Sequence, residues 1–175
     1  MESACGTIIR LTRLTDSSLI VHWFCEQHGL LKTVAKAARK PKGPFAGKID
    51  LFYCGEFVFQ RARRGSLHAL REVSIHHWRE GLRSDYSRTL LAAYFGLMIE
   101  KAVEPEHPDH QLHDLLSRAL DHVETAGASL RALHHFEREM LRALGLANER
   151  RPIEESLQEA VGRLPENRSE LLERL

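Results

Sequence analysis

The sequence predicts an α+β fold, in which an N-terminal five-stranded barrel of the oligonucleotide/oligosaccharide-binding (OB) type is followed by an α-helical domain. Five short segments rich in β-branched and aromatic residues precede residue 74, and turn-forming residues separate them. Beyond Gly81 the hydrophobic period changes to that of helices. Five antiparallel strands in about 70 residues are too few for a sandwich and suit a small, partly open barrel. We expect an OB-fold domain at 1–80 and a helical domain at 81–175.

The connections between the strand segments favour antiparallel pairing. Thr15-Asp16-Ser17 and Gln27-His28-Gly29 are turn sequences, and residues 61–65 close the last pair. Only the connection 39–48 is long. The strands are expected at 6–14, 17–25, 30–38, 49–60 and 67–73.

Three apolar stripes at helical spacing predict three amphipathic helices. Boundaries are marked by Ser84-Asp85, Pro108-Asp109, Gly127 and Gly145. A shorter fourth helix is expected from Pro152, and residues 165–175 are expected to fray or to form a last turn. The stripes comprise Leu90, Leu91, Tyr94, Phe95 and Met98; Leu112, Leu115, Leu116, Ala119, Leu120 and Val123; and Leu130, Leu133, Phe136, Met140, Leu141 and Leu144.

Composition places the chain among cytoplasmic globular proteins. With 175 residues, of which 43% are hydrophobic, it can bury a core. Cys5, Cys25 and Cys54 are odd in number and widely spaced, so we expect small buried hydrophobes in a reducing compartment rather than a disulfide framework. No segment approaches the roughly 18 apolar residues of a membrane span, and we expect no membrane association.

Charge is distributed unevenly along the chain, although the formal net charge is only +1. Residues 1–80 hold 13 Lys and Arg against 7 Asp and Glu, whereas residues 81–175 hold 12 against 17. The densest cations follow an apolar segment in a loop stiffened by Pro41 and Pro44. Such a local positive field suits a polyanion, so nucleic acid is the expected ligand.

The expected DNA contacts are cations on the strands and loops of the barrel, which would bind phosphate without reading sequence. Phe45 or Tyr53 could stack on bases, although aromatic residues of a small barrel, Trp23 included, more often belong to the core. The candidates are first Lys36, Arg39, Lys40 and Lys42, then Arg61, Arg63 and Arg64, together with Arg10; Arg13, Lys32 and Lys48 fall on the same elements.

Other functions remain open from the residues alone. The basic loop could dock an acidic protein surface, which would make the chain an interaction adaptor, or the barrel could bind RNA. Histidines around His107, His110 and His113 could chelate a metal, but they would lie at an exposed helix start, and we expect no metal site. No nucleophile or phosphate-loop motif is present, so we expect no enzymatic activity.

Four passages resemble the RecO family of bacterial recombination-mediator proteins. They are the opening strand pair at 6–21, the passage from Glu26-Gln27-His28-Gly29 into the basic loop, the basic hairpin at 61–67, and the helical passage that runs from Phe136 to Leu144-Gly145. Ala37 stands where the family usually has glycine. No four-cysteine zinc module follows Gly145, so neither a metal nor a cofactor is expected.

The resemblance implies a non-catalytic DNA repair protein of the bacterial cytoplasm, associated with the nucleoid. Such a protein binds single- and double-stranded DNA, promotes strand annealing, and with RecR helps to load RecA onto DNA coated by single-strand binding protein. The resemblance also implies an apolar pocket among the helices, rimmed by cations, that receives the acidic, Phe-ending tail of single-strand binding protein. Arg131, Arg138 and Arg142 fall on nearly one face of a helix and are the expected rim residues.

Overall fold

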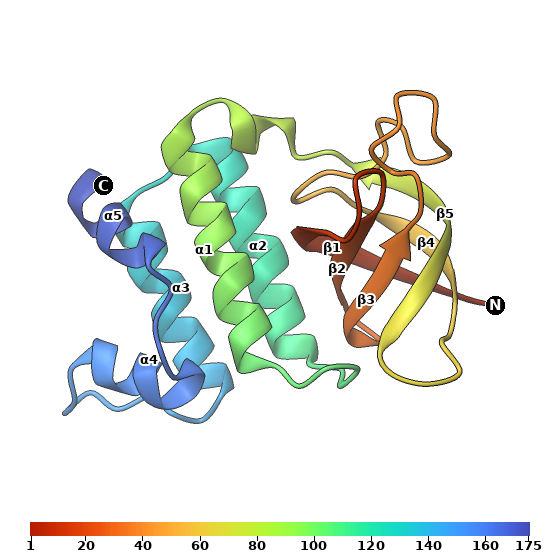
Figure 1. Cartoon of the computed structure of the whole chain (residues 1–175). Helices are drawn as coiled ribbons and strands as arrows, with labels where there is room; N and C mark the ends of the chain where they lie inside the picture. The colour runs from red at the N-terminus through yellow and green to blue at the C-terminus, as the bar shows by residue number, and fades with distance from the viewer. The chain divides into compact units, whose positions relative to one another are not determined.

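Five strands form a closed barrel in the computed structural model, which describes all residues 1–175 (Figure 1). Every neighbouring pair is antiparallel except β3 and β5, whose parallel pairing completes the order β1-β2-β3-β5-β4. The predicted fold class, a five-stranded barrel followed by helices, is confirmed, but the barrel is closed rather than partly open and one strand pair is parallel rather than antiparallel. The strands are β1 (Glu2–Arg13), β2 (Leu19–Cys25), β3 (Gly29–Ala35), β4 (Cys54–Gln60) and β5 (Leu67–His77).

Aromatic side chains fill the barrel. The Trp23 ring stacks on Phe57 with 4.1 Å between ring centroids, and its indole Nε1 donates a 2.9 Å hydrogen bond to Thr33 Oγ1, which satisfies the buried polar group. Phe45 comes from the long connection between β3 and β4 and is only 4% exposed in the same core. Phe45 is therefore not available to stack on a base, because its ring anchors the connection instead.

The segment 49–53 differs from the predicted strand 49–60, which begins only at Cys54. Phe52 has a φ of 69°, which is incompatible with an extended strand. Its N–H donates to the Ile8 carbonyl at 2.8 Å, and Ile8 N–H donates to the Tyr53 carbonyl at 2.9 Å. These two bonds hold the segment against β1 where the β1–β2 register shifts. Tyr53 packs, half-buried, against the barrel core.

The helices begin and end close to the predicted signals. Asp85 Oδ1 accepts a 2.9 Å bond from the Arg88 N–H at the start of α1, and Gly145 adopts a φ of 71° just after α3. Residues 165–175, expected to fray or to form a last turn, do not fray and include a full fifth helix, in which Leu171 is fully buried. The elements are η1 (Glu80–Arg83), α1 (Tyr86–Ala102), α2 (His110–Ala126), α3 (Leu130–Ala143), α4 (Ile153–Val161) and α5 (Asn167–Arg174).

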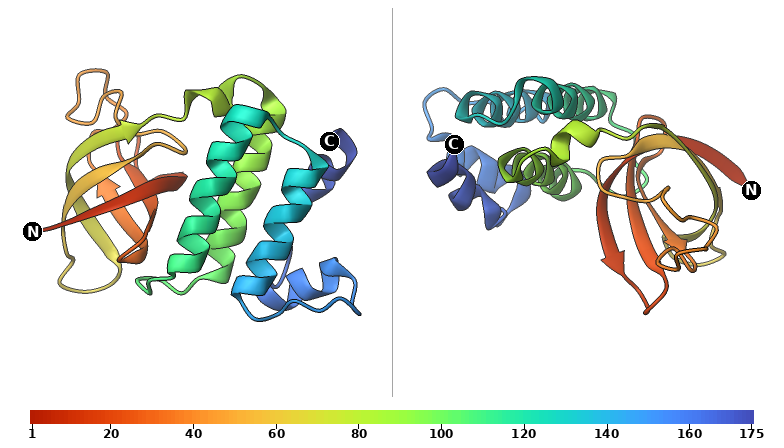
Figure 2. Two further views of the ribbon diagram at one scale, coloured as in Figure 1. Left: turned by 180° about the vertical axis from the view of Figure 1, so that it is seen from behind. Right: turned by 90° about the horizontal axis from the view of Figure 1, so that it is seen from above.

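Contacts divide the chain into two compact units, which we call the barrel unit and the helical unit. The barrel unit comprises residues 1–78 and 103–110, and the helical unit comprises 79–102 and 111–175. Within the helical unit α1 and α2 lie side by side (Figure 2), and Phe95 stacks on Phe136 with 4.1 Å between centroids. The predicted division into domains at residue 80 stays a prediction, because contacts alone do not show which segments fold independently.

Candidate nucleic-acid interface

The connection 36–48, which we call the basic loop, is built from consecutive tight turns. Lys40 N–H donates to the Ala37 carbonyl at 3.1 Å, Gly43 N–H to the Lys40 carbonyl at 2.9 Å, and Lys48 N–H to the Phe45 carbonyl at 3.0 Å. A Cβ atom at Gly43 would lie 2.3 Å from the Ala37 oxygen, so this turn requires glycine. The buried Phe45 ring and these turns give the loop a defined shape.

The turn between β1 and β2 supports the basic loop. Arg39 N–H donates to the Ser17 carbonyl at 3.0 Å, and Arg39 Nη1 donates to the Asp16 carbonyl at 3.2 Å. Ser18 Oγ accepts a weaker bond from Ala37 N–H at 3.4 Å. Arg39 therefore both joins the loop to the turn and contributes an exposed positive charge.

The loop lysines have no partner of opposite charge. Lys36, Lys40, Lys42 and Lys48 are exposed, and their ammonium groups make no ion pair. Like charges so close in sequence repel one another, and a polyanion laid across them relieves that repulsion.

The three arginines of the hairpin between β4 and β5 lie in different environments. Arg61 Nε donates to Glu2 Oε1 at 2.7 Å, and Arg61 Nη1 donates to Glu106 Oε2 at 2.6 Å. These bonds raise the pKa of Arg61, with the Glu2 bond first, and neutralise its charge locally. Arg61 therefore fixes the base of the hairpin, with two carboxylates on its guanidinium, and its predicted contact with DNA stays a prediction.

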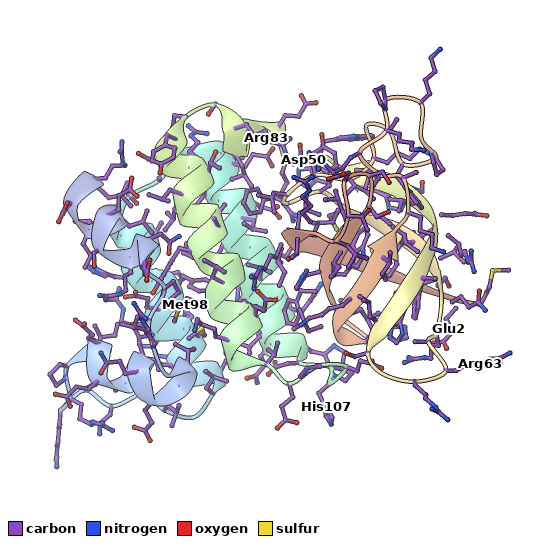
Figure 3. All side chains as sticks on the ribbon, in the orientation of Figure 1. Glu2, Asp50, Arg63, Arg83, Met98 and His107 are labelled. Carbon is purple, nitrogen blue, oxygen red and sulfur yellow. The ribbon has the colours of Figure 1, made fainter.

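Arg63 and Arg64 lie beyond that base, exposed and without an ion pair. Arg63 extends away from the barrel near Glu2 (Figure 3). Gly65, with a φ of 78°, supplies the left-handed residue that the turn needs. The hairpin thus presents two free guanidinium groups on a braced turn.

His68 completes the brace beneath the hairpin. Its Nδ1 accepts from Ala62 N–H at 3.2 Å, which leaves Nε2 as the donor toward Glu106 Oε1, also at 3.2 Å. Burial would raise the pKa of Glu106, but Arg61 and His68 together lower it. The Glu106 carboxylate therefore stays ionised and ties segment 103–110 to the hairpin.

Strand β3 lies between the basic loop at one end and the hairpin at the other. Lys32 pairs with Leu67, the residue that directly follows the hairpin, and Lys36 follows the other end of β3. Across the sheet Lys32 also lies opposite His22, which lies opposite Arg10. Arg10 is therefore exposed on the same outer wall of the barrel, in the row that contains Lys32.

We call the cations that run from loop to hairpin the cationic track. In Figure 1 the basic loop stands at one end of β3 and the hairpin at the other. The basic loop and the hairpin also lie beyond opposite ends of β4. The seven residues of this strand span roughly 23 Å at about 3.3 Å per residue, which sets the scale of the separation. The track consists of Lys36, Arg39, Lys40, Lys42 and Lys48 in the loop, Lys32 on β3, and Arg63 and Arg64 in the hairpin.

The β4 side of the barrel is acidic by contrast. Glu56 on β4 lies opposite Cys5 on β1, and Glu72 on β5 lies opposite Val58 on β4. Both glutamates are exposed. A polyanion that passes between the two ends of the barrel is therefore favoured along β3 and disfavoured along β4.

The arginines predicted to rim a single helical pocket line two different ones. Arg131 lines a pocket between α2 and α3, of about 660 Å³, whereas Arg138 and Arg142 line a pocket of about 590 Å³ between α3 and α4. The three share a face of α3, but seven residues of helix separate Arg131 from Arg138 by about 10 Å along the axis. Sharing a face did not place them at one site.

Residues that organise the interface escaped the sequence prediction. Glu106 braces the hairpin from a position 45 residues beyond Arg61, and no local pattern indicates such a pair. The contact of Arg39 with Asp16 was also missed, although polar turn residues before β2 are a common place for a loop to dock.

No helix of the structure is long and apolar enough to span a bilayer.

Family models and relatives agree on the kind of protein this fold and surface define. The model described as Recombination protein O N terminal matches residues 1–79, and Recombination protein O C terminal matches 83–149. The chain is 30% identical over 142 residues to the DNA repair protein RecO of Syntrophus aciditrophicus, covering 81% of this chain and 55% of that relative. With RecO of Pelobacter propionicus it shares 31% identity over 130 residues, 74% of this chain and 52% of the relative.

The chain belongs to the RecO family of DNA repair proteins. It spans about half the length of the curated relatives it matches.

Proposed function

We propose that the chain is a non-catalytic DNA-binding protein that holds single- and double-stranded DNA on the cationic track, promotes annealing of complementary strands, and assists RecA loading together with RecR and single-strand binding protein. The observation that carries the proposal is the set of unpaired, exposed lysines on a folded loop beside β3. Cations of this kind bind phosphate by releasing counterions and need no base contact. Annealing requires only that two strands be held while their repulsion is screened.

The absence of an exposed aromatic in the basic loop bears on the mode of binding. Because the Phe45 ring is buried, the loop offers phosphate contacts rather than base stacking. We expect similar affinity for single strands of different base composition. RNA offers the same phosphates, so parallel titrations with RNA separate a DNA function from the alternative of RNA binding.

The first prediction compares two variants with equal loss of charge. The loop variant Lys36→Gln, Lys40→Gln, Lys42→Gln is expected to bind labelled single-stranded DNA at least about tenfold more weakly than wild type, because it loses three phosphate contacts. The control Lys101→Gln, Arg150→Gln, Arg163→Gln removes three exposed charges from the helical unit. It is expected to bind like wild type in fluorescence anisotropy.

Equal weakening in both triple variants would mean that net charge, not the track, drives binding. Wild type that binds no DNA at low salt would favour the alternative in which the basic loop docks an acidic protein.

The pocket between α2 and α3 supports a separate partner contact. Its apolar lining includes the stacked rings of Phe95 and Phe136, and Arg118 and Arg131 lie among its other lining residues. An apolar floor beside cations suits an acidic peptide that ends in Phe, the chemistry of the tail of single-strand binding protein implied by the resemblance.

A fluorescent acidic peptide ending in Phe tests this contact. Arg131→Gln is expected to weaken peptide binding severalfold, because Arg131 lines the α2–α3 pocket. Arg138→Gln, on the same helix face but in the other pocket, serves as the matched control. A loss confined to Arg138→Gln would assign the tail to the α3–α4 pocket instead.

A further inference from the structure

The register of β3 and β5 brings apolar side chains to the outer wall of the barrel. Thr33 pairs with His68, and both are almost fully buried inside the barrel. Successive residues of a strand point to opposite faces of the sheet, so the residues on either side of this pair point outward. The outward pairs are Lys32 with Leu67 and Val34 with Ala69.

Four outward residues form what we call the outer strip: Ile20 on β2, Val34 on β3, and Leu67 and Ala69 on β5. Ile20 lies opposite Val34, so the strip crosses three neighbouring strands. Leu67 is 38% exposed, and the other three residues are half-buried. The strip therefore presents aliphatic side chains to solvent on the same wall as the cationic track.

Cations of the track border the outer strip. Lys32 lies beside Leu67 in the sheet and precedes Val34 by two residues, and Lys36 follows Val34 by two residues. Arg64 precedes Leu67 by three residues in the hairpin. Neighbouring strands lie about 5 Å apart. A DNA strand whose phosphates contact Lys32 therefore brings its sugars and bases within reach of the strip.

Unpaired bases differ from paired ones in the surface that they offer. The faces of unpaired bases are apolar and open to water, whereas stacking and pairing hide them in a duplex. An aliphatic side chain that packs on such a face removes apolar surface from water, which is favourable. Because every base has such a face, the contact tolerates any sequence.

We propose that the outer strip, with Leu67 as its most exposed member, contacts the bases of single-stranded DNA and makes the cationic track prefer single strands to duplex. The inference rests on the proposed function, because it requires DNA on the track. The cations bind the phosphates of either form, and the strip distinguishes the two forms. The buried Phe45 ring leaves this contact to the strip.

The experiment compares Leu67→Gln with wild type, using a labelled single strand and the duplex of the same sequence in fluorescence anisotropy. Glutamine keeps the length of the side chain but replaces its apolar end. The variant is expected to bind the single strand about fivefold more weakly and the duplex unchanged, because only unpaired bases reach the strip. Leu172→Gln is the matched control, since Leu172 is 40% exposed in the helical unit. It is expected to bind both forms like wild type.

Leu67→Tyr is expected to change the single-strand affinity in the opposite direction. A ring at this position stacks on a base, so we expect about threefold tighter binding of the single strand and no change for the duplex. A gain of binding cannot come from a folding defect, so this variant tests the strip even if Leu67→Gln is destabilised.

Two outcomes would overturn the inference alone. Equal weakening of single-strand and duplex binding by Leu67→Gln would mean that Leu67 only shapes the hairpin. Unchanged single-strand binding in both Leu67 variants would mean that bases do not contact the strip. Wild type that binds neither form at low salt would contradict the proposed function together with this inference.

Discussion

Ala37 holds a backbone conformation that its side chain disfavours. Its φ of 57° lies in the left-handed region, where a Cβ atom crowds the following carbonyl. The RecO family usually has glycine at this place, as the resemblance implies, and the structure supplies the reason, since the chain leaves β3 here and turns into the basic loop. The loop keeps its shape because Phe45 and Arg39 hold it from both sides.

Ala37→Gly is predicted to stabilise the protein by about 0.5 kcal/mol, since relief of left-handed strain outweighs the greater freedom of glycine in the unfolded chain. Ala35→Gly, in regular strand β3, is the control and should destabilise it. Urea unfolding of both variants measures the difference. A destabilised Ala37→Gly variant would show that the turn is not strained in solution.

At the scale of elements, α5 is held by a buried ion pair that joins three helices. Arg168 Nε donates to Glu137 Oε1 on α3 at 2.7 Å, and Tyr94 on α1 donates its hydroxyl to the same oxygen at 2.6 Å. Burial and the Glu137 charge raise the pKa of Tyr94, so the phenol stays a donor. Glu137 is fully buried, and its charge is compensated only while Arg168 remains in place.

Glu137→Gln is predicted to lower the free energy of unfolding by about 3 kcal/mol, because it leaves the largely buried Arg168 without its counter-charge. Glu154→Gln is the matched control. Glu154 lies 3.8 Å from the same guanidinium but is 58% exposed, so the loss should stay under about 1 kcal/mol. Equal effects in urea unfolding would argue against the Glu137 pair as the element that fixes α5.

The sequence predicted elements wherever one periodic pattern dominated. The stripe through Leu133, Phe136 and Met140 is buried as expected, and the fold class follows from such local patterns. The sequence predicted no more than a last turn where α5 forms, because the stabilising partner of the helix, Glu137, is 31 residues away and looks like an ordinary polar residue beside an apolar stripe. Phe52 was predicted to lie in a strand because nothing in the sequence of segment 49–53 indicates a positive φ.

The residue types of the candidate site could be predicted from the sequence, but the ion pairs that these residues form could not. Dense cations identified the loop and hairpin, whereas the roles of Arg61 and Arg63 separate only once Glu2 and Glu106 are seen beside Arg61. Long-range pairs of this kind follow from topology, which the sequence pattern does not specify.

At the scale of the whole molecule, the charge asymmetry of the sequence becomes a spatial asymmetry within the barrel unit. Cations of the basic loop, Lys32 and the hairpin follow β3, while Glu56 and Glu72 occupy the β4 side. A single strand of DNA held by this surface would touch both ends of the track. We therefore propose that the loop and the hairpin bind one ligand together.

The most direct measurement is the salt dependence of binding to labelled single-stranded DNA, for wild type, the loop variant and the hairpin variant Arg63→Gln, Arg64→Gln. Each lost phosphate contact should reduce the slope of log K against log salt by about 0.7. We expect the slope to fall by about 2.1 for the three loop lysines and by about 1.4 for the two arginines. An unchanged slope in the hairpin variant would contradict a track that runs the length of β3, and unchanged slopes in both variants would place DNA elsewhere.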